Sequence, residues 1–330
     1  MDIDSKFMAH AIDLAKQTCV QTLPNPKVAC VIVSPAGEII SEGVHGELGK
    51  DHAEVIALDR AGSSAVGATV YVTLEPCAHI GRTGPCVDAL HSAGIKRVVF
   101  ATKDKMNGGE AVLRQKQIEV VGGVLEKEAS ETLAPWLHAT ECQTPYVTLK
   151  IASTLDGFIA AVDGTSQWIT SEESRHYVQK IRLEVDGIVT STNTVKLDNP
   201  QYTVRDFEVN FQPHVYVLGK SALENFSRIE GRYTSINSHN PGDLLDRATA
   251  DGKEHLLIEA GGKVAGAFLK ANLVNRIIWM SAPIVLGDGV SAVQGLGVST
   301  LKDALKGQIA EQFVLGGDTI TVLRMNRCSH

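Results

Sequence analysis

Short apolar runs alternate with stretches of helical periodicity along the first half of the chain. Strands are predicted at 28–33, 39–43, 69–74, 97–101 and 118–121, and helices at 53–61, 85–93 and 126–138. Pro85 suits a helix start, because the N–H that proline lacks would have no partner in the first turn. Strands that alternate with helices predict an α/β sheet covered by layers of helices.

A second pattern starts after residue 144. Segment 145–150 opens a new set of elements, in which the apolar run 256–258 leads into two glycines and an alanine-rich helical stretch. A chain of 330 residues also exceeds the size at which a single hydrophobic core stops growing. We therefore predict two domains, residues 1–144 and 145–330.

Composition narrows the classes of function. The net charge of −7 offers no basic surface for nucleic acid, which favours a small-molecule substrate. No apolar run approaches the length of a membrane span, and the acidic start of the chain lacks the features of a signal peptide. Six cysteines without a regular pattern do not suggest a disulfide framework. We expect a cytoplasmic protein with no nucleic-acid or membrane partner.

His52, Glu54, Cys77 and Cys86 have the spacing of a zinc site that keeps one position open. His52 and Glu54 form a His-x-Glu motif, and each cysteine follows a proline. One imidazole and two thiolates fill three corners of a tetrahedron, and the fourth holds a water whose pKa zinc lowers to about 7. Glu54 is then free to move protons. This arrangement is typical of zinc enzymes that remove amino groups from nucleobase rings.

The alternative for these ligands is a structural zinc site, which normally has a fourth protein ligand. The other cysteines stand singly and are expected to be buried small side chains or free thiols; they are Cys19, Cys30, Cys142 and Cys328. Within the predicted elements, His52 lies where a loop enters a helix and Cys86 lies in the first turn of another. The partial positive charge of a helix N-terminus favours a thiolate at Cys86.

The N-terminal half resembles the deaminase half of the bifunctional riboflavin-biosynthesis deaminase–reductase family. The resemblance covers residues 5–101 and rests on the motifs at 24–28 and 73–77 and on the eight residues between Cys77 and Cys86. It implies contacts from Asn25, His79 and Arg82 to the pyrimidine and its ribose phosphate. His79 taken alone is also compatible with a packed imidazole. The sequence departs from the family at Ala29, where glycine is usual, and at 103–107, where an Asp-Pro-Asn-Pro loop is usual.

The second half resembles the reductase half of the same family, whose fold is like that of dihydrofolate reductase. The matching segments are 150–157, 166–171, 194–205 and 259–262, with Arg182. The resemblance implies substrate contacts from Ser166, Arg182, Tyr202, Arg205 and Glu259. It implies NADPH as cofactor, held by Ala152, Trp168, Thr194, Asp198, Gly261, Gly262, Lys263, Val264, Ala265, Gly266 and Ala267.

Some of these positions have a physical reason of their own. Gly261 and Gly262 follow an apolar strand and open a helix, so backbone amides there suit a cofactor diphosphate, although the Gly-x-Gly-x-x-Gly fingerprint is absent. Arg182 and Arg205 offer bidentate forks to a phosphate, or else are solvated surface charges. Trp168 either covers a cofactor or fills a core, and the sequence alone favours the core. Segment 215–220 lacks the acidic or serine residues expected after its strand, which weakens the expected preference for NADPH over NADH.

The resemblance implies a two-step enzyme of riboflavin synthesis in a homo-oligomer. A zinc-dependent step removes the ring amino group of a diaminohydroxy-pyrimidine carrying a ribosylamino phosphate, and an NADPH-dependent step then reduces the ribosyl group to ribityl. Two alternatives remain. One is a deaminase and reductase pair acting on another pyrimidine or a pterin precursor. The other is a deaminase joined to a reductase-like module that only binds ligand.

Overall fold

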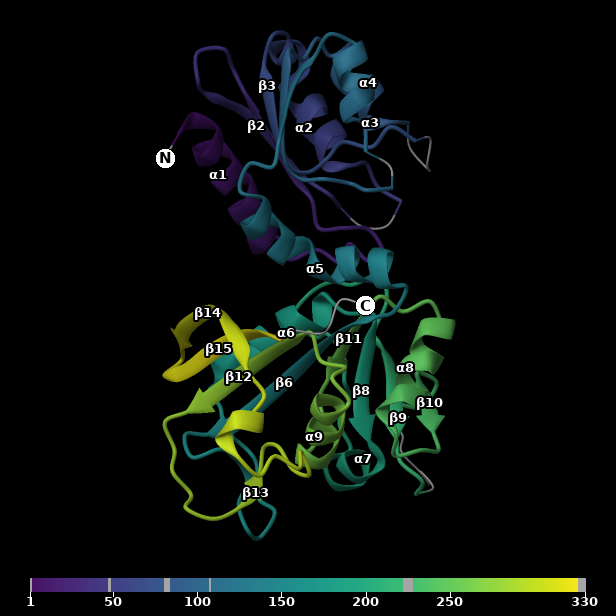
Figure 1. Cartoon of the computed structure of the whole chain (residues 1–330), viewed down its shortest axis with the longest axis vertical. Helices are drawn as coiled ribbons and strands as arrows, with labels where there is room; N and C mark the ends of the chain where they lie inside the picture. Colours follow the sequence, from purple (N-terminus) through teal and green to yellow (C-terminus); the bar gives the residue numbers. More distant parts are fainter. Residues whose placement is uncertain (1, 47–48, 80–83, 107, 222–227, 326–330) are drawn as a thin grey trace. The chain divides into compact units, whose positions relative to one another are not determined.

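The computed structural model of the chain divides into two units, Met1–Leu137 and His138–His330, and each is described by itself (Figure 1). It describes all residues except 1, 47–48, 80–83, 107, 222–227 and 326–330. The division lies within helix α5 (Glu126–Cys142), ahead of the boundary that the sequence predicts at 144/145.

The N-terminal unit contains a five-stranded sheet in the order β2-β1-β3-β4-β5. β1 is antiparallel to β2 and β3, and β3, β4 and β5 are parallel. Its strands are β1 (Ala29–Val33), β2 (Ile39–Val44), β3 (Thr69–Leu74), β4 (Arg97–Thr102) and β5 (Glu119–Gly122). Its helices are α1 (Ile3–Gln17), α2 (Ala53–Ala61), the 3₁₀ turn η1 (Gly62–Ala65), α3 (Cys86–Ser92), α4 (Glu110–Gln115) and the first part of α5.

Both faces of this sheet are buried, because successive side chains of a strand point to opposite sides. In β1, Cys30 and Ile32 join the core beneath α2, α3 and α4, whereas Val31 and Val33 join the core beneath α1. Figure 1 shows α1 on one side of the sheet and α2 and α3 on the other. The unit is thus a three-layer α/β/α domain, as the alternation of strands and helices predicts.

The C-terminal unit contains an eight-stranded sheet in the order β10-β9-β8-β11-β6-β12-β15-β14. Each strand from β10 through β9, β8, β11 and β6 to β12 is parallel to the next. The remaining strands, β15 and β14, form an antiparallel hairpin, and β15 is antiparallel to β12. The strands of the sheet are β6 (Tyr146–Thr154), β8 (Gly187–Ser191), β9 (His214–Leu218), β10 (Tyr233–Ile236), β11 (His255–Ile258), β12 (Arg276–Ala282), β14 (Gly307–Leu315) and β15 (Asp318–Met325). A separate two-stranded ladder pairs β7 (Phe158–Ala160) with β13 (Val290–Ser291).

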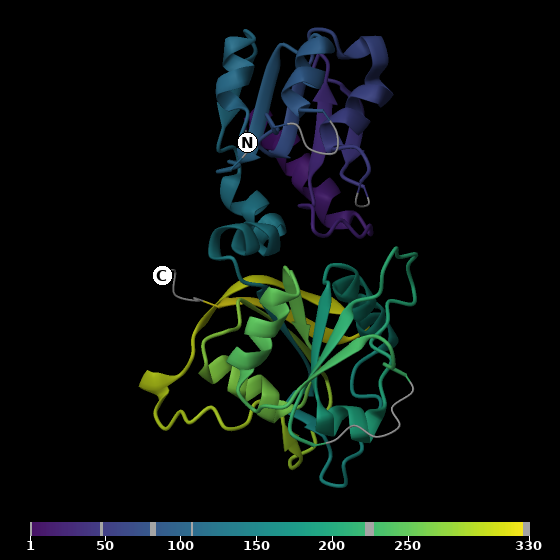
Figure 2. The ribbon, with the colours of Figure 1, turned by 90° about the vertical axis from the view of Figure 1, so that its right-hand side faces the viewer.

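Helices cover both faces of the larger sheet (Figure 2). One core contains residues of α8 (Pro241–Ala250) and α9 (Gly262–Lys270). The other contains residues of α6 (Glu172–Leu183) and α7 (Thr192–Asp198). A short 3₁₀ turn, η2 (Leu301–Asp303), precedes β14. The segments after β8, β9 and β11 meet at one edge of the sheet, because these three strands are parallel neighbours.

The elements predicted in the first half of the chain are confirmed, with ends that differ by a few residues. Helices α1 and α4 are additional to those predictions. α1 is an amphipathic helix whose side-chain cap is Asp2, which accepts from the N–H of Ser5 at 2.8 Å. Among the described residues no helix is long and apolar enough to span a membrane.

Candidate active sites

The predicted zinc ligands come together from three separate elements. His52 is the N-cap residue of α2, Cys77 follows β3, and Cys86 is the first residue of α3. The Nδ1 atom of His52 lies 3.1 Å from the Sγ atom of Cys86 and 3.5 Å from that of Cys77. In the described part of the chain, these three residues form a group that could hold a metal ion, because their ligand atoms all lie within 4.8 Å of one another.

The donor set fits a tetrahedral zinc ion with one open corner. The pKa of Cys77 is lowered, because the Cys86 thiol and then His52 hydrogen-bond to its thiolate. The sequence favours the thiolate at Cys86 instead, since that residue starts a helix. In the structure the neighbouring Cys77 sulfur holds the pKa of Cys86 above its usual value. A cation between the two sulfurs removes this competition, since both then bind as thiolates.

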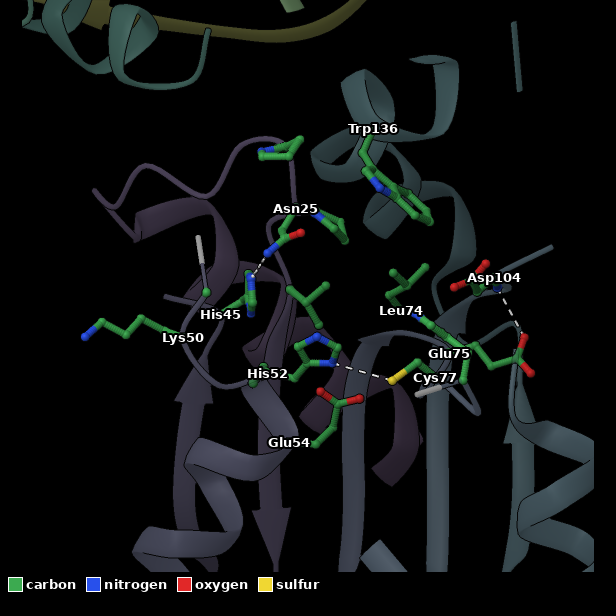
Figure 3. A pocket seen from close by; sticks show the side chains of 16 residues that line it. Asn25, His45, Lys50, His52, Glu54, Leu74, Glu75, Cys77, Asp104 and Trp136 are labelled. Carbon is green, nitrogen blue, oxygen red and sulfur yellow. Dashed lines mark hydrogen bonds between the residues drawn. The ribbon is translucent and has the colours of Figure 1, made fainter. Parts of the chain in front are cut away.

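Glu54 lies beside this cluster and is not one of its ligands. It occupies the first turn of α2 and is 4% exposed. Burial raises its pKa, although His52 acts in the opposite direction. A carboxyl group with a raised pKa is suited to take and return a proton near neutral pH. Figure 3 shows Glu54 directly below the His52 ring, facing the cavity.

A cavity of about 370 Å³ opens above the cluster. Asn25 and His79, both predicted to contact substrate, line it, together with His52, Glu54 and Cys77. Arg82, the third predicted substrate contact, lies outside the described residues. The lining also includes Lys50 and Trp136, which the sequence analysis does not identify.

His45 is a further lining residue that the sequence analysis misses. Its Nε2 lies 2.9 Å from Nδ2 of Asn25, and its ring centroid lies 5.3 Å from that of His52. Burial, followed by the charge of His52, lowers the pKa of His45 to about 4. A neutral His45 therefore accepts from the Asn25 amide and fixes how Asn25 faces the cavity. The signal in the sequence that could have identified His45 is its position two residues after the predicted strand 39–43.

The two departures from the family pattern are accommodated by local packing. Ala29 is fully buried in β1, where its N–H donates to Oγ1 of Thr73 at 3.1 Å. The segment after β4 is held by Glu75, whose carboxylate accepts from the backbone N–H of Asp104 and Glu110 at 3.2 and 2.8 Å. A Cβ atom on Gly108 would lie 2.4 Å from the Glu75 carboxylate, so this approach requires glycine. Glu75 thus positions the atypical loop beside Cys77.

The predicted cofactor segment at 261–267 forms the start of α9, directly after β11. Gly261 has open space around it, whereas a Cβ atom on Gly262 would lie 2.3 Å from the carbonyl oxygen of Ser291. A Cβ atom on Gly266 would likewise lie 1.8 Å from the carbonyl oxygen of Gln294. Close packing against segment 291–294 therefore explains why positions 262 and 266 are glycines. Ala265 is buried in the core, and Gly261 and the exposed Lys263 remain available to a ligand.

The other predicted cofactor residues are spread over several elements. Ala152 is partly buried in β6, Thr194 lies in the first turn of α7, and Asp198 ends that helix. The pKa of Asp198 is raised by partial burial. Trp168 is 67% exposed, so the core role that the sequence alone favours is wrong. The Arg175 guanidinium lies over its ring, 4.6 Å from the centroid.

Three of the predicted substrate contacts form a buried network. Arg182 donates to both carboxylate oxygens of Glu259, at 2.6 and 2.9 Å, and to the carbonyl oxygen of Thr203 at 3.0 Å. The hydroxyl of Tyr202 donates to the backbone carbonyl of Glu259 at 3.1 Å. Tyr202 is 4% exposed, and burial raises its pKa above its usual value. The network thus fixes the residue that connects β11 to α9.

Lys150 and Arg205 complete this region. Burial lowers the pKa of the Lys150 amine, although Glu259 acts in the opposite direction, and the sequence analysis assigns Lys150 no role. Arg205 is exposed, and its Nη1 donates to Oε1 of Gln201 at 3.3 Å. Ser166 is partly buried in the loop between β7 and α6. Because Arg182 is occupied by Glu259, Arg205 is the predicted phosphate ligand whose guanidinium is open to solvent.

Comparison with known proteins finds matches for both halves of the chain. Residues 1–102 match the cytidine and deoxycytidylate deaminase zinc-binding region, and residues 145–320 match the RibD C-terminal domain. Riboflavin biosynthesis protein RibD of Mycobacterium tuberculosis is 41% identical over 326 residues, which cover 96% of each chain.

Solved structures are similar over nearly the whole chain. RibD of Acinetobacter baumannii has 34% identity and a TM-score of 0.84, covering 98% of this chain and 99% of that one. A deaminase/reductase from Thermotoga maritima has 29% identity, a TM-score of 0.82 and the same coverage. The expected cytidine-deaminase-like and dihydrofolate-reductase-like folds are confirmed, as are zinc and NADPH as cofactors. The chain belongs to the RibD family of bifunctional riboflavin-biosynthesis enzymes.

Proposed function

We propose that the protein carries out two consecutive reactions on one phosphorylated pyrimidine. The Thermotoga maritima relative is described as a diaminohydroxyphosphoribosylaminopyrimidine deaminase and 5-amino-6-(5-phosphoribosylamino)uracil reductase. We assign both activities to this protein. A hydrolytic deamination comes first, and a reduction of the ribosyl group with NADPH follows. The observation that carries the proposal is the convergence of His52, Cys77 and Cys86 beside a buried Glu54 in a cavity.

In the deamination, His52, Cys77 and Cys86 would hold the zinc ion, which when bound lowers the pKa of a water molecule to about 7. Glu54 takes a proton from the attacking water and delivers it to the departing amino group. The ring carbon gains oxygen and ammonia leaves, so one water is consumed. Asn25, oriented by His45, donates to the pyrimidine edge.

The phosphate of this substrate needs a cation near the rim of the cavity. Lys50 is the lysine among the described residues that line the cavity. We assign it to the phosphate together with His79, and we retain Arg82 as the third partner proposed from the family resemblance. Charged hydrogen bonds to phosphate are stronger than neutral ones, which favours ammonium and guanidinium groups in this role.

In the reduction, NADPH when bound would supply the hydride that the sugar carbon receives. We propose that Gly261 and the start of α9 hold the cofactor diphosphate, that Trp168 covers the cofactor, and that Asp198 orients the sugar. Ala152, Thr194 and the backbone of segment 262–267 complete the proposed cofactor site, with Ser166 and Tyr202 beside the substrate. Arg205 anchors the substrate phosphate, whereas Arg182 and Glu259 shape the site through their mutual contact. Lys150, with its lowered pKa, is the proposed proton source for the sugar oxygen.

We also propose the division of labour along the chain, with deamination in residues 1–144 and reduction in residues 145–330. The RibD C-terminal domain match, which begins at residue 145, supports this boundary. A cytoplasmic homo-oligomer is part of the same proposal. Sedimentation at several protein concentrations tests the oligomer.

Product analysis tests the function. The purified zinc-loaded protein should convert the diaminopyrimidine substrate to the deaminated ribosyl compound without NADPH, and to the ribityl compound when NADPH is added. Mass spectrometry distinguishes the two, because deamination raises the mass by about one unit and reduction adds about two more, from the atoms exchanged. Deamination without NADPH oxidation would support a ligand-binding C-terminal module. Turnover of a different pyrimidine or a pterin with no turnover of this substrate would favour the other alternative.

A further inference from the structure

The indole ring of Trp136 extends from helix α5 into the deaminase cavity. Trp136 continues the apolar stripe of Ala129 and Leu133, at the spacing of a buried helix face, and packs partly against the core of the N-terminal unit. It is partly exposed, because its ring also lines the cavity. Figure 3 shows the ring on the side of the cavity opposite Glu54, beside Asn25 and Leu74.

The N–H group of this ring is not used by the part of the chain that the structure describes. Among residues whose positions are described, the Trp136 indole N–H has no hydrogen-bond partner, whereas Nε1 of Trp279 donates to Oγ of Ser153 at 2.8 Å. A tryptophan that serves only as core normally finds a partner for this N–H when it is buried. Trp136 therefore offers a flat apolar face and a free donor to whatever occupies the cavity.

The other residues that line the cavity are of two chemical kinds, polar and apolar. Glu54, Asn25 and His45 provide polar atoms that suit the edges of a heteroaromatic ring. A planar pyrimidine whose amino carbon faces Glu54 and the zinc ligands must then present its face to an apolar wall. Trp136 is the lining side chain with an aromatic hydrocarbon face of matching size, alongside the smaller Leu74.

We propose that Trp136 stacks on the pyrimidine ring of the deaminase substrate and selects for planar rings at this site. The inference rests on the proposed deaminase function and deepens it. Stacking of a base on an aromatic side chain changes binding by roughly 5- to 150-fold when the aromatic group is removed. Because the contact is made before any bond changes, it acts on binding more than on the chemical step.

Two substitutions separate stacking from simple packing. Trp136→Phe keeps an aromatic face, whereas Trp136→Leu keeps an apolar side chain without one. In the zinc-loaded full-length protein, Trp136→Leu should raise the KM of deamination by roughly 5- to 150-fold with a much smaller change in kcat. Trp136→Phe should retain most of the wild-type affinity. Reduction of already deaminated substrate should be unchanged in both variants.

A matched control lies next in the sequence. Leu137 packs against the same core but does not line the cavity. Leu137→Ala should lower the melting temperature while leaving the deamination KM near the wild-type value. Wild-type KM in Trp136→Leu, or an equal rise of KM in Trp136→Phe, Trp136→Leu and Leu137→Ala, would overturn the stacking role.

Fluorescence gives a second readout that does not depend on turnover. The chain has three tryptophans, and the Glu54→Gln background prevents consumption of the substrate. Substrate should quench emission in Glu54→Gln, and the additional change Trp136→Phe should remove that quenching while calorimetry still detects binding. Quenching that persists at full amplitude after Trp136→Phe would contradict the proposal. Full deaminase activity in Glu54→Gln would instead refute the proposed deaminase mechanism, which distinguishes the two failures.

Discussion

Arg182 and Glu259 form a bidentate ion pair, with nitrogen to oxygen distances of 2.6 and 2.9 Å, in which each side chain is 10% exposed. Arg182 lies on α6, and Glu259 directly follows β11. Burial alone raises the pKa of Glu259, but the Arg182 guanidinium outweighs burial and the net pKa is lowered. The pair thus ties α6 to the turn that leads into the proposed cofactor segment.

Removing one partner should destabilise the C-terminal unit. Arg182→Met leaves the Glu259 carboxylate buried without its cation, and loss of one member of a buried pair costs about 3–5 kcal/mol. Because the pKa of Glu259 is lowered in the folded state, the stabilisation is present at neutral pH and is lost as the pH falls through that pKa. Urea unfolding should therefore show a smaller difference between Arg182→Met and wild type at acid pH than at neutral pH. An equal difference at both would contradict the assignment.

The zinc site should depend on both thiolates. Cys77→Ser removes a soft ligand from a three-residue set, so the purified variant should contain much less than the one zinc per chain expected for the wild type. Elemental analysis measures this directly. Cys142→Ser is the matched control, because Cys142 is an exposed free thiol away from the cluster. Normal zinc content in Cys77→Ser would rule out this ligand set.

Glu54→Gln should separate the two activities. The amide keeps the shape of the carboxyl group but cannot transfer the proton, so deamination should fall by about 10²- to 10⁴-fold. Zinc content and reduction of deaminated substrate should persist, since Glu54 is not among the clustered ligands. A parallel loss of both activities would mean that the sites do not work independently.

Arg205→Ala should weaken binding of the phosphorylated substrate and spare the cofactor. Loss of a charged hydrogen bond typically costs about 1.5–3 kcal/mol, or roughly 10- to 150-fold in binding. Steady-state kinetics should show this as a raised KM for substrate at unchanged KM for NADPH. Arg247→Ala, which removes an exposed ion pair on α8, serves as the control. A raised KM for NADPH instead would place Arg205 in the cofactor site.

Glu254 should make the C-terminal unit less stable as the pH rises. Its Oε2 atom is buried without a hydrogen-bond partner among the described residues, and burial, with a smaller effect from Asp186, raises its pKa to about 7. A carboxyl group whose pKa is higher in the folded state destabilises that state as the pH rises. The loss of stability develops between its unfolded pKa, about 4.3, and its folded pKa. Glu254→Gln should therefore raise the melting temperature at pH 8 and have little effect at pH 4. The exposed Glu230→Gln is the control, and an identical shift in both variants at both pH values would refute the burial argument.

The sequence by itself determined the local elements of the first half and the candidate zinc ligands, which the structure brings together. Apolar periodicity follows from which faces of each strand and helix are buried, as at 69–74 and 53–61, so it is visible without the fold. The spacing of His52, Cys77 and Cys86 specifies a donor set that few sites other than zinc share. The resemblance in the second half likewise predicts a cofactor-binding role for the segment around Gly261, which stays a prediction.

Only the tertiary structure decided which side chains remain available to ligands. Arg182 and Glu259, far apart in the chain, form a buried ion pair, and Gly262 and Gly266 serve close packing against segment 291–294. His45 and Trp136 enter the deaminase cavity from a loop and a helix that carry no motif. Burial, pairing and orientation depend on contacts between residues distant in sequence, and periodicity and spacing contain no information about those contacts.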